Sequence, residues 1–352
     1  MPNFQQRVML DIAGKVRAYL KLDVGISRSG VPESAGRPPE PLQEQLAAKD
    51  REISRLRARF AAREVAATTD DIPPDHLIWI FGVARTGSSW LGAMMGDLDD
   101  HATWYEPYVG DVFGYAYYMR AGEQQRSRED YILGDPYREV WIRSLRMFVL
   151  GGAHARFPGL GENSYLVVKE PNGSVGAPLL AEALPESRLI LLVRDPRDVV
   201  ASLLAAQKEG SWGAGEDPLA DTDPDEFVRQ RARMYDASFG KAWEAYEAHE
   251  GRKVATRYED LRHDTIGELE RIYSSFGIPI EEEQLRRVVE KHAWENIPEK
   301  QKGPDKPRRK ASPGGWQEDL TPEQARMVEE ITTPVLNEFY PGWKHARAVP
   351  SD

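Results

Sequence analysis

A glycine-rich turn at residues 82–90 has the residue types and spacing of a phosphate-binding loop. It reads Gly-Val-Ala-Arg-Thr-Gly-Ser-Ser-Trp and lies between a strand-like apolar run and a helical pattern. Glycines let the backbone curl until its N–H groups and the N-terminus of the next helix point at an anion. The hydroxyls of Thr86, Ser88 and Ser89 add donors. These features predict an oxyanion site, and the alternative is a turn that only closes a strand–helix junction.

The same loop departs from the pattern of ATP-binding loops. A Walker A loop carries Lys directly after its second glycine, where the side chain reaches the β- and γ-phosphates. Here that position is Ser88, and the cation of the loop is Arg85. The departure disfavours a P-loop nucleotide kinase or hydrolase, which we keep as the second hypothesis.

A second candidate anion site lies at residues 192–202, Leu-Val-Arg-Asp-Pro-Arg-Asp-Val-Val-Ala-Ser. Arg194 closes a buried strand and Ser202 lies in the helix that follows. Because ligands of parallel sheets bind at the carboxyl ends of the strands, Arg194 could fork onto a second phosphate with Ser202 assisting. An Arg–Asp surface pairing within residues 194–198 explains the same residues equally well.

The elements that must position these residues are short apolar strands alternating with helices. Apolar runs predict strands at residues 77–82, 165–169, 188–193 and 253–258. Helical patterns follow at residues 88–97, 174–184, 196–209 and 262–276, with further helices at 225–249, 281–291 and 321–338. This alternation predicts an α/β fold of three layers, α/β/α, with a central parallel sheet.

The amino-acid composition excludes several classes of protein and of site. The chain has 352 residues, a formal net charge of −11 and no cysteine, which excludes disulfides, thiolate metal sites and a cysteine nucleophile. The acidic balance argues against nucleic acid as a partner. No run approaches the ~18 apolar residues of a membrane span, and the charged first twenty residues lack a signal sequence, so we expect a cytoplasmic protein. The histidines show no metal-ligand spacing, and we expect no metal.

The N-terminal part is organised differently from the rest. Residues 1–22 have an amphipathic helical pattern, typical of a helix that docks on its own domain or a partner, or that lies on a membrane surface. Residues 23–41 have the composition of a flexible linker. Residues 42–70 follow a heptad pattern, which leaves a homodimer through 42–67 and packing on the main domain equally open. The main domain is expected at 71–345, followed by a tail at 346–352.

Several motifs together resemble the sulfotransferases that use 3′-phosphoadenosine 5′-phosphosulfate (PAPS), and the carbohydrate branch is the most similar. They are Arg-Thr-Gly-Ser-Ser-Trp at 85–90, Tyr-Glu-Pro at 105–107, Val-Arg-Asp-Pro-Arg at 193–197 with Ser202, and Arg-Tyr-Glu-Asp-Leu at 257–261. The resemblance covers about residues 75–340. Their joint order is more specific than any one motif.

The resemblance implies which residues bind PAPS, the sulfuryl donor. The 5′-phosphosulfate would be held by residues 85–90, namely Arg85, Thr86, Gly87, Ser88, Ser89 and Trp90. Arg194 and Ser202 would hold the 3′-phosphate, and Tyr258 would be a further contact. Arg309 and Lys310, in the basic stretch 302–310, resemble the family's late lid, although Ala311 replaces the glycine that usually follows. Arg85 stands where many members have Lys and would stabilise charge rather than donate a proton.

Sulfuryl transfer also needs a general base near the acceptor hydroxyl. Our first candidate is Glu106, which follows the loop helix and lies among aromatic residues expected to raise its pKa. A structural carboxylate before Pro107 is the alternative. Glu170 is the reserve base, and Lys169 would face the transferred sulfuryl group unless it only reaches solvent.

The acceptor side is the part that the motifs define least. Aromatic residues crowd residues 104–160, which we take as the acceptor-binding subregion, with weak helical or strand periodicity. Loops at 210–225 and 298–316 are expected to act as lids. The first hypothesis is therefore a PAPS-dependent O-sulfotransferase acting on a glycan, glycolipid or other hydroxylated metabolite, with contact to a lipid-linked acceptor left open. After the P-loop nucleotide kinase or hydrolase, the third hypothesis is a non-catalytic nucleotide-binding adaptor.

Overall fold

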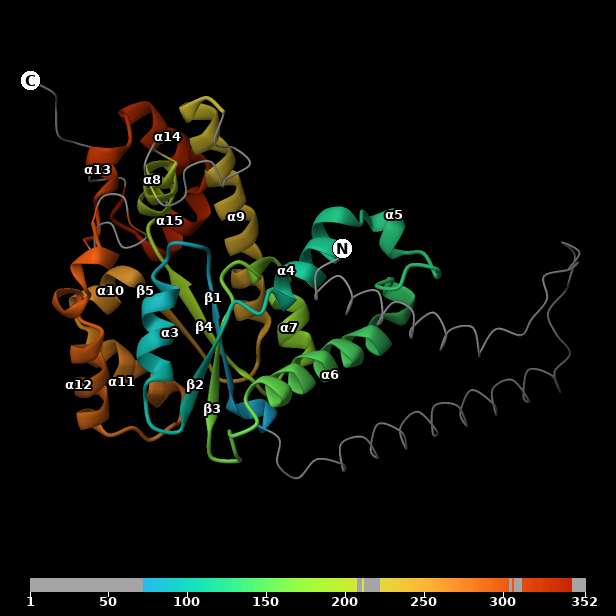
Figure 1. Ribbon diagram of the computed structural model, residues 1–352. Coiled ribbons are helices and arrows are strands. Elements are labelled where there is room, and N and C mark those ends of the chain that lie inside the picture. The colour runs from blue at the N-terminus through green and yellow to red at the C-terminus, as the bar shows by residue number, and fades with distance from the viewer. Residues whose placement is uncertain (1–71, 208–210, 212–221, 304–305, 307–311, 344–352) are drawn as a thin grey trace, which may run out of the picture. The chain divides into compact units, whose positions relative to one another are not determined.

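The computed structural model describes residues 72–207, 211, 222–303, 306 and 312–343 (Figure 1). These residues belong to one compact unit that spans residues 70–352. The expected N-terminal helix, linker and heptad segment lie outside the described residues, as do the tail, most of the 210–225 loop, Arg309 and Lys310.

The sheet has five parallel strands in the order β2-β3-β1-β4-β5. Their bounds are β1 Leu77–Phe81, β2 His101–Tyr105, β3 Tyr165–Lys169, β4 Arg188–Val193 and β5 Lys253–Arg257. The four strands predicted from apolar runs are confirmed, as is the parallel α/β/α fold. β2 is an edge strand that the sequence analysis missed.

Alternate residues of the central strand β1 face two separate cores. Leu77, Trp79 and Phe81 belong to one buried cluster, whereas Ile78 and Ile80 belong to another. All five are buried because helices cover both faces of the sheet, as parallel sheets require.

Two helical layers enclose the sheet (Figure 1). The layer with Ile78 and Ile80 contains α3 (Ser88–Gly96), α11 (Thr265–Phe276) and α12 (Glu282–Lys291). The opposite layer contains α6 (Arg138–Arg156), α7 (Ala177–Ala183) and α9 (Pro224–Ala248). Helix α8 (Pro196–Ala206) packs with α9 and α14 (Pro322–Ile331) in a third, smaller cluster.

The helices expected at 262–276 and 321–338 are each interrupted. Residues Tyr258–His263 form a separate helix, α10, and Asp264 caps the N-terminus of α11. At the other interruption, Thr332 ends α14 before α15 (Thr333–Phe339). Thr321 caps the N-terminus of α14, where its hydroxyl and the Gln324 side chain form a capping box.

The subregion at 104–160 is more helical than its weak periodicity suggested. It contains α4 (Val109–Gly114), a π-helix η2 (Tyr115–Arg120), α5 (Glu123–Arg126) and the 19-residue helix α6. The remaining short elements are η1 (Pro74–His76), η3 (Asp135–Tyr137), η4 (Ser174–Gly176), η5 (Trp294–Asn296), η6 (Glu299–Gln301) and α13 (Trp316–Asp319). Among the described helices, none is both long and apolar enough to cross a bilayer.

Candidate active site

The glycine-rich turn connects β1 to α3 at the carboxyl edge of the sheet. Helix α3 begins at Ser88, directly after Gly87, so its unpaired first N–H groups lie at the loop. Thr86 is fully buried and its hydroxyl donates to the Val83 carbonyl at 2.8 Å. The Thr86 hydroxyl therefore stabilises the turn, whereas Ser88 and Ser89 line a cavity.

Gly87 is required by both conformation and space. Its φ is 89°, a left-handed value that side chains disfavour, and a Cβ added there would lie 2.6 Å from Cδ2 of Tyr258. The Tyr258 ring therefore packs directly on the loop. This contact places Tyr258, which was predicted to contact the sulfuryl donor, beside the first turn of α3.

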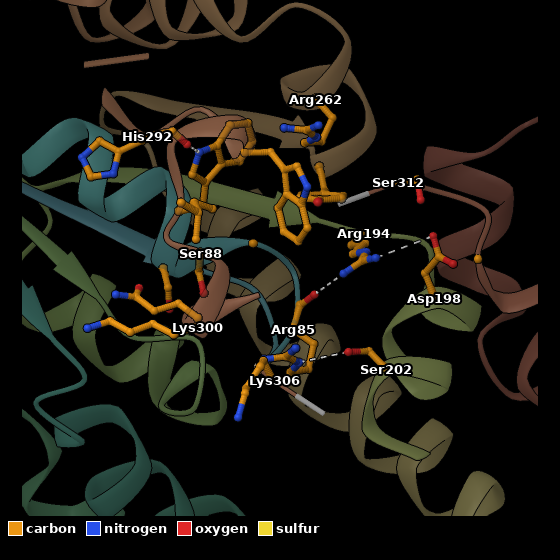
Figure 2. A pocket seen from close by; sticks show the side chains of 18 residues that line it. Arg85, Ser88, Arg194, Asp198, Ser202, Arg262, His292, Lys300, Lys306 and Ser312 are labelled. Carbon is orange, nitrogen blue, oxygen red and sulfur yellow. Dashed lines mark hydrogen bonds and ion pairs between the residues drawn. The ribbon is translucent and has the colours of Figure 1, made fainter. Parts of the chain in front are cut away.

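The two predicted anion-binding segments meet through their side chains (Figure 2). Arg85 Nε donates to Ser202 Oγ at 3.1 Å, and Arg194 Nη1 donates to the Arg85 carbonyl at 2.8 Å. The Arg194 guanidinium lies 4.4 Å from the centre of the Tyr258 ring. Its buried Nε has no hydrogen-bond partner among the described residues. An orphaned buried donor of this kind fits an anionic ligand.

The alternative of an Arg–Asp pairing in this segment is present, but it is buried rather than at the surface. Asp195 binds Arg197 at 2.6 Å in a buried ion pair, and Arg197 also binds Glu329 at 3.0 Å. Arg194 lies 3.9 Å from Asp198. Asp195 and Glu329 thus hold Arg197 in the interior, whereas Arg194 lies at the cavity with Asp198 beside it.

A cavity of about 620 Å³ is lined by residues of both predicted anion-binding segments. Its cationic lining residues are Arg85, Arg194, Arg262, Lys300 and Lys306. Its hydroxyl groups come from Ser88, Ser89, Ser202 and Ser312, and its flat or apolar surfaces from Trp90, Tyr258, Trp294 and Ile297. Such a lining suits a ligand with several negative charges and a planar ring system.

Asp198 is the one carboxylate among the described residues that line this cavity. It accepts hydrogen bonds from the backbone N–H groups of Gly314 at 2.8 Å and Trp316 at 3.0 Å. Burial raises its pKa, which Arg194 and the two backbone donors oppose. Asp198 therefore holds the late segment at 314–316 against the cavity.

A second group of predicted site residues lies where β2 and β3 end. The register pairs Tyr105 with Lys169, so Glu106 follows the edge strand next to the Lys169 side chain. Lys169 is only 4% exposed and its Nζ forms an ion pair with Glu106 Oε1. The Tyr108 hydroxyl donates to Glu106 Oε2 at 3.0 Å. The alternative of a Lys169 that only reaches solvent is therefore wrong.

The expected rise in the pKa of Glu106 is also wrong. Burial acts to raise this pKa, but the Lys169 ammonium and the Tyr108 hydroxyl outweigh it and hold the pKa below its usual value. Glu106 is therefore ionised at neutral pH. The aromatic neighbours supply a hydrogen bond as well as apolar surface.

Glu170 occupies a different environment although it is the next residue after Lys169. It is 1% exposed, and its two carboxylate oxygens accept from the backbone N–H groups of Tyr108 and Gly110, each at 3.1 Å. Burial raises its pKa to about 7. Glu170 thus fixes the start of α4.

The two groups of residues are connected but distinct. Glu106, Lys169 and Glu170 do not line the cavity, whereas Arg85, Gly87, Ser88, Ser89, Trp90, Arg194, Ser202 and Tyr258 do. Tyr105 links the groups: its hydroxyl donates to the Ser89 carbonyl at 3.3 Å, and its ring centre lies 5.5 Å from Lys169 Nζ.

Backbone strain marks the same region. Among the described residues, four non-glycine residues have positive φ, and three of them belong to these two groups or adjoin them: Arg85 (72°), Glu106 (43°) and Tyr108 (59°). Conformations of this kind persist where the surrounding structure enforces them, and they cluster at functional sites.

A comparison with protein-family models gives a match over residues 78–282 to the model described as the sulfotransferase family. The chain belongs to the sulfotransferase family. Membership supports sulfuryl transfer as its class of reaction. The match does not distinguish the carbohydrate branch from others.

Solved structures of sulfotransferases are similar at low sequence identity. Mouse sulfotransferase SULT7A1, complexed with PAP, has 13% identity and a TM-score of 0.47, and the alignment covers 80% of this chain and 91% of that one. STF9 from Mycobacterium avium has 16% identity, a TM-score of 0.46 and coverage of 78% of each chain. The sulfotransferase domain of the Synechococcus olefin synthase has 17% identity, a TM-score of 0.45 and coverage of 76% and 96%. Among curated proteins, no sequence matches this chain.

The sulfotransferase has cavity residues that sequence reasoning missed. Arg262 on α10 lies 5.2 Å from the Trp90 ring, and Trp90 Nε1 donates to the His292 carbonyl at 3.0 Å. Trp294 and Ile297 line the cavity beside them. No motif pointed to these four contacts, although Lys300 and Lys306 fall within the expected lid at 298–316. Among the described residues, no cluster of three His, Cys, Asp or Glu could hold a metal ion.

Proposed function

We propose that this sulfotransferase uses PAPS as its donor and transfers the sulfuryl group to a hydroxyl of a glycan, glycolipid or other hydroxylated metabolite. The observation that carries the proposal is the linkage of Ser202 to Arg85 and of Arg85 to Arg194 beside the N-terminus of α3, in one cavity. Two guanidinium groups that line one cavity suit the two anionic ends of this nucleotide. When bound, PAPS would supply the sulfuryl group and a bisphosphate leaving group.

The residues present fit that donor. The buried Nε of Arg194, which has no hydrogen-bond partner within the part of the chain that the structure describes, and the Ser202 hydroxyl would hold the 3′-phosphate. The N–H groups at the start of α3, with Ser88 and Ser89, would hold the phosphosulfate end. Residues 85–90 would thus all contribute, with Thr86 acting through its support of the turn.

Arg85 is placed to stabilise charge rather than to move a proton. Its guanidinium stays protonated at any working pH, and its Nε is already oriented by Ser202. Charge that develops on the leaving phosphate would therefore meet a fixed cation. Positioned cations of this kind supply much of the catalysis in phosphoryl transfer, which sulfuryl transfer resembles.

We assign the acceptor side to Glu106 and Lys169. Glu106 is ionised at neutral pH and would accept the proton of the acceptor hydroxyl at a carboxylate oxygen. Lys169 orients that carboxylate and would stabilise negative charge on the transferred group. Tyr105, in contact with Ser89, keeps both close to the phosphate loop.

Two observations favour Glu106 over Glu170 as the base. Both oxygens of Glu170 already accept backbone N–H groups, and its side chain is 1% exposed. Glu106 is partly exposed and directly follows the edge strand. Glu170 remains the reserve assignment in this proposal.

Replacement of Glu106 by Gln tests the proposal. We expect turnover to fall by roughly 10²- to 10⁴-fold, the usual contribution of a general base, with little change in the affinity for adenosine 3′,5′-bisphosphate. The matched control is Glu129→Gln, which removes an exposed carboxylate and should leave both quantities unchanged. Wild-type turnover in Glu106→Gln would defeat the assignment of the base.

A further inference from the structure

The helix that follows Glu106 exposes apolar side chains where surface helices expose polar ones. Helix α4 and the π-helix η2 run consecutively from Val109 to Arg120. Four exposed side chains recur at steps of four, three and four residues, each between 47% and 57% exposed: Tyr108, Val112, Tyr115 and Met119. We call these four residues the apolar ridge. An amphipathic surface helix has the opposite pattern, with its apolar stripe turned inward.

Close backbone packing fixes the helix in this orientation. A Cβ added at Gly110 would lie 2.2 Å from the Gly173 carbonyl oxygen, and one at Gly114 would lie 2.4 Å from the Gly176 nitrogen. Glu170 also binds the N–H groups of Tyr108 and Gly110. The helix cannot rotate to bury the ridge without losing these contacts, so the apolar exposure is built into the fold. Contiguous apolar surface of this kind marks an interaction site.

The ridge begins at the proposed base. The hydroxyl of Tyr108, its first member, donates to Glu106 Oε2 at 3.0 Å. An acceptor whose hydroxyl lies at Glu106 must place the rest of its body on neighbouring surface. From Tyr108 to Met119 the helix advances by about 16 Å, at ~1.5 Å per residue. This continuity indicates that the acceptor itself covers the ridge.

The chemistry of the ridge indicates what kind of acceptor it suits. Between residues 105 and 119 the sequence has no Lys or Arg, and its charged residues are Glu106 and Asp111. The four members of the ridge thus offer an anionic glycan no cation, although Lys169, paired with Glu106, and Arg120, directly after Met119, lie at its two ends. Val112 and Met119 also lack the flat rings on which sugars stack, whereas they suit hydrocarbon. Burial raises the pKa of Asp111, which is consistent with low polarity around the helix.

We propose that the apolar ridge binds the hydrocarbon part of the acceptor, and that the acceptor is an uncharged alcohol with an elongated apolar body. The alcohol oxygen forms a bond to sulfur as the bond between sulfur and the leaving phosphate breaks. Its proton passes to Glu106, and adenosine 3′,5′-bisphosphate leaves with the bond's electron pair. This inference rests on the proposed function, because it places the acceptor hydroxyl at Glu106.

A series of linear alcohols tests the ridge. With PAPS saturating, kcat/KM is measured for 1-butanol, 1-hexanol, 1-octanol and 1-decanol, and binding to the bisphosphate-saturated protein is measured by calorimetry. A fully buried methylene gains about fourfold, and one covered on a single side about twofold. We therefore expect kcat/KM and affinity to rise about 60-fold over the six methylenes between 1-butanol and 1-decanol.

A charge placed at the far end of the ridge should act on long alcohols selectively. Met119→Glu is expected to lower kcat/KM for 1-tetradecanol, which is added to the series, about tenfold more than for 1-butanol, because only a chain of roughly 18 Å spans the ~16 Å of helix to that position. Met119 is 48% exposed, so the substitution does not disturb the core. The control is Met234→Glu, at a methionine that is 52% exposed on α9 and should show the wild-type series.

Three results would overturn the ridge proposal. The first is a flat dependence on chain length in turnover and in binding, or no binding of 1-decanol. The second is a dimer in light scattering that Met119→Glu converts to monomer, since a second copy would then cover the ridge. The third is binding to phosphatidylcholine vesicles without any alcohol that Met119→Glu abolishes. If only the ridge proposal is wrong, the protein still binds the bisphosphate, and Glu106→Gln still abolishes sulfuryl transfer to a polar acceptor such as methyl β-galactoside. If the proposed function is wrong, neither the binding of the bisphosphate nor the transfer is observed.

Discussion

Lowering the pH distinguishes the two glutamates that could take the acceptor proton. Lys169 and the Tyr108 hydroxyl hold the pKa of Glu106 below the ordinary glutamate value of 4.5. Burial raises the pKa of Glu170 to about 7. A general base works in its ionised form, so activity is lost as the pH falls through the pKa of whichever residue serves.

The two assignments predict rates that differ by more than an order of magnitude. At about pH 5.5 a base with a pKa of about 7 is ~3% ionised, so the rate would fall about thirtyfold from its plateau. A base with a pKa below 4.5 is more than ~90% ionised at the same pH, so the rate would fall by less than about 10%. Because we assign Glu106 as the base, we predict the second result, a rate that stays close to its plateau at this pH.

The assay is kcat/KM for an uncharged acceptor between about pH 5 and pH 8, with PAPS saturating. Saturation matters because the second ionisation of a phosphate monoester lies near pH ~6 and would otherwise alter donor binding. Circular dichroism at each pH confirms that the protein remains folded. An acid limb centred near pH ~7 that disappears in Glu170→Gln would refute the assignment of Glu106.

Three substitutions test the surroundings of the site. Gly87→Ala places a methyl group 2.6 Å from the Tyr258 ring at a φ of 89°, so calorimetry should show at least a tenfold loss of affinity for adenosine 3′,5′-bisphosphate. Wild-type affinity would contradict the packing of Tyr258 on the loop. The control is Gly159→Ala, where the added methyl group meets open space. Ser202→Ala removes the 3.1 Å hydrogen bond to Arg85 and should weaken bisphosphate binding by about 1 kcal/mol, and an unchanged Kd would exclude the hydroxyl from the donor site. Thr321→Ala should lower the free energy of unfolding in urea by about 1 kcal/mol without changing bisphosphate affinity, since it removes only the cap of α14; unchanged stability would show that the cap contributes nothing.

Of the four strands that sequence analysis identified, β1, β3 and β4 lie inside the sheet and are buried, and β5 is an edge strand in which buried Val254 and Thr256 alternate with partly exposed residues. β1 and β4 are continuous apolar runs because helices cover both sides of the sheet. The sequence analysis did not detect β2, because this edge strand is partly exposed along its length and contains His101 and Thr103. The sequence His-Ala-Thr-Trp-Tyr therefore contains no run of β-branched apolar residues to detect.

Helix α6 was missed for the opposite reason, an excess of apolar residues. Its buried stripe includes Trp141 and Leu145, at ordinary helical spacing. Val140, Met147 and Phe148 lie on the same helix and are about half exposed, which obscures the stripe. Periodicity alone cannot separate an apolar residue that is buried from one that is displayed.

The candidate site was predictable where residue type decides chemistry. The phosphate loop, Arg194 and Ser202 were identified from their types and their places at strand ends, and the structure brings them into one cavity. The pairing of Glu106 with Lys169 was not predictable, because it depends on the register of the missed strand β2 against β3. The direction of the Glu106 pKa shift followed from that pairing, and so it was predicted with the wrong sign.

The donor site carries the central claim, and a thermal-shift titration tests it most directly. Wild type and Arg194→Ala are titrated with adenosine 3′,5′-bisphosphate and, separately, with magnesium ATP, with Arg128→Ala as an exposed arginine control. A ligand at ~100 times its Kd stabilises the folded state by ~2.7 kcal/mol, which raises Tm by a few degrees. We predict that shift for the bisphosphate alone, in wild type and Arg128→Ala but not in Arg194→Ala. A shift with magnesium ATP only, or an equal bisphosphate shift in Arg194→Ala, would contradict the account.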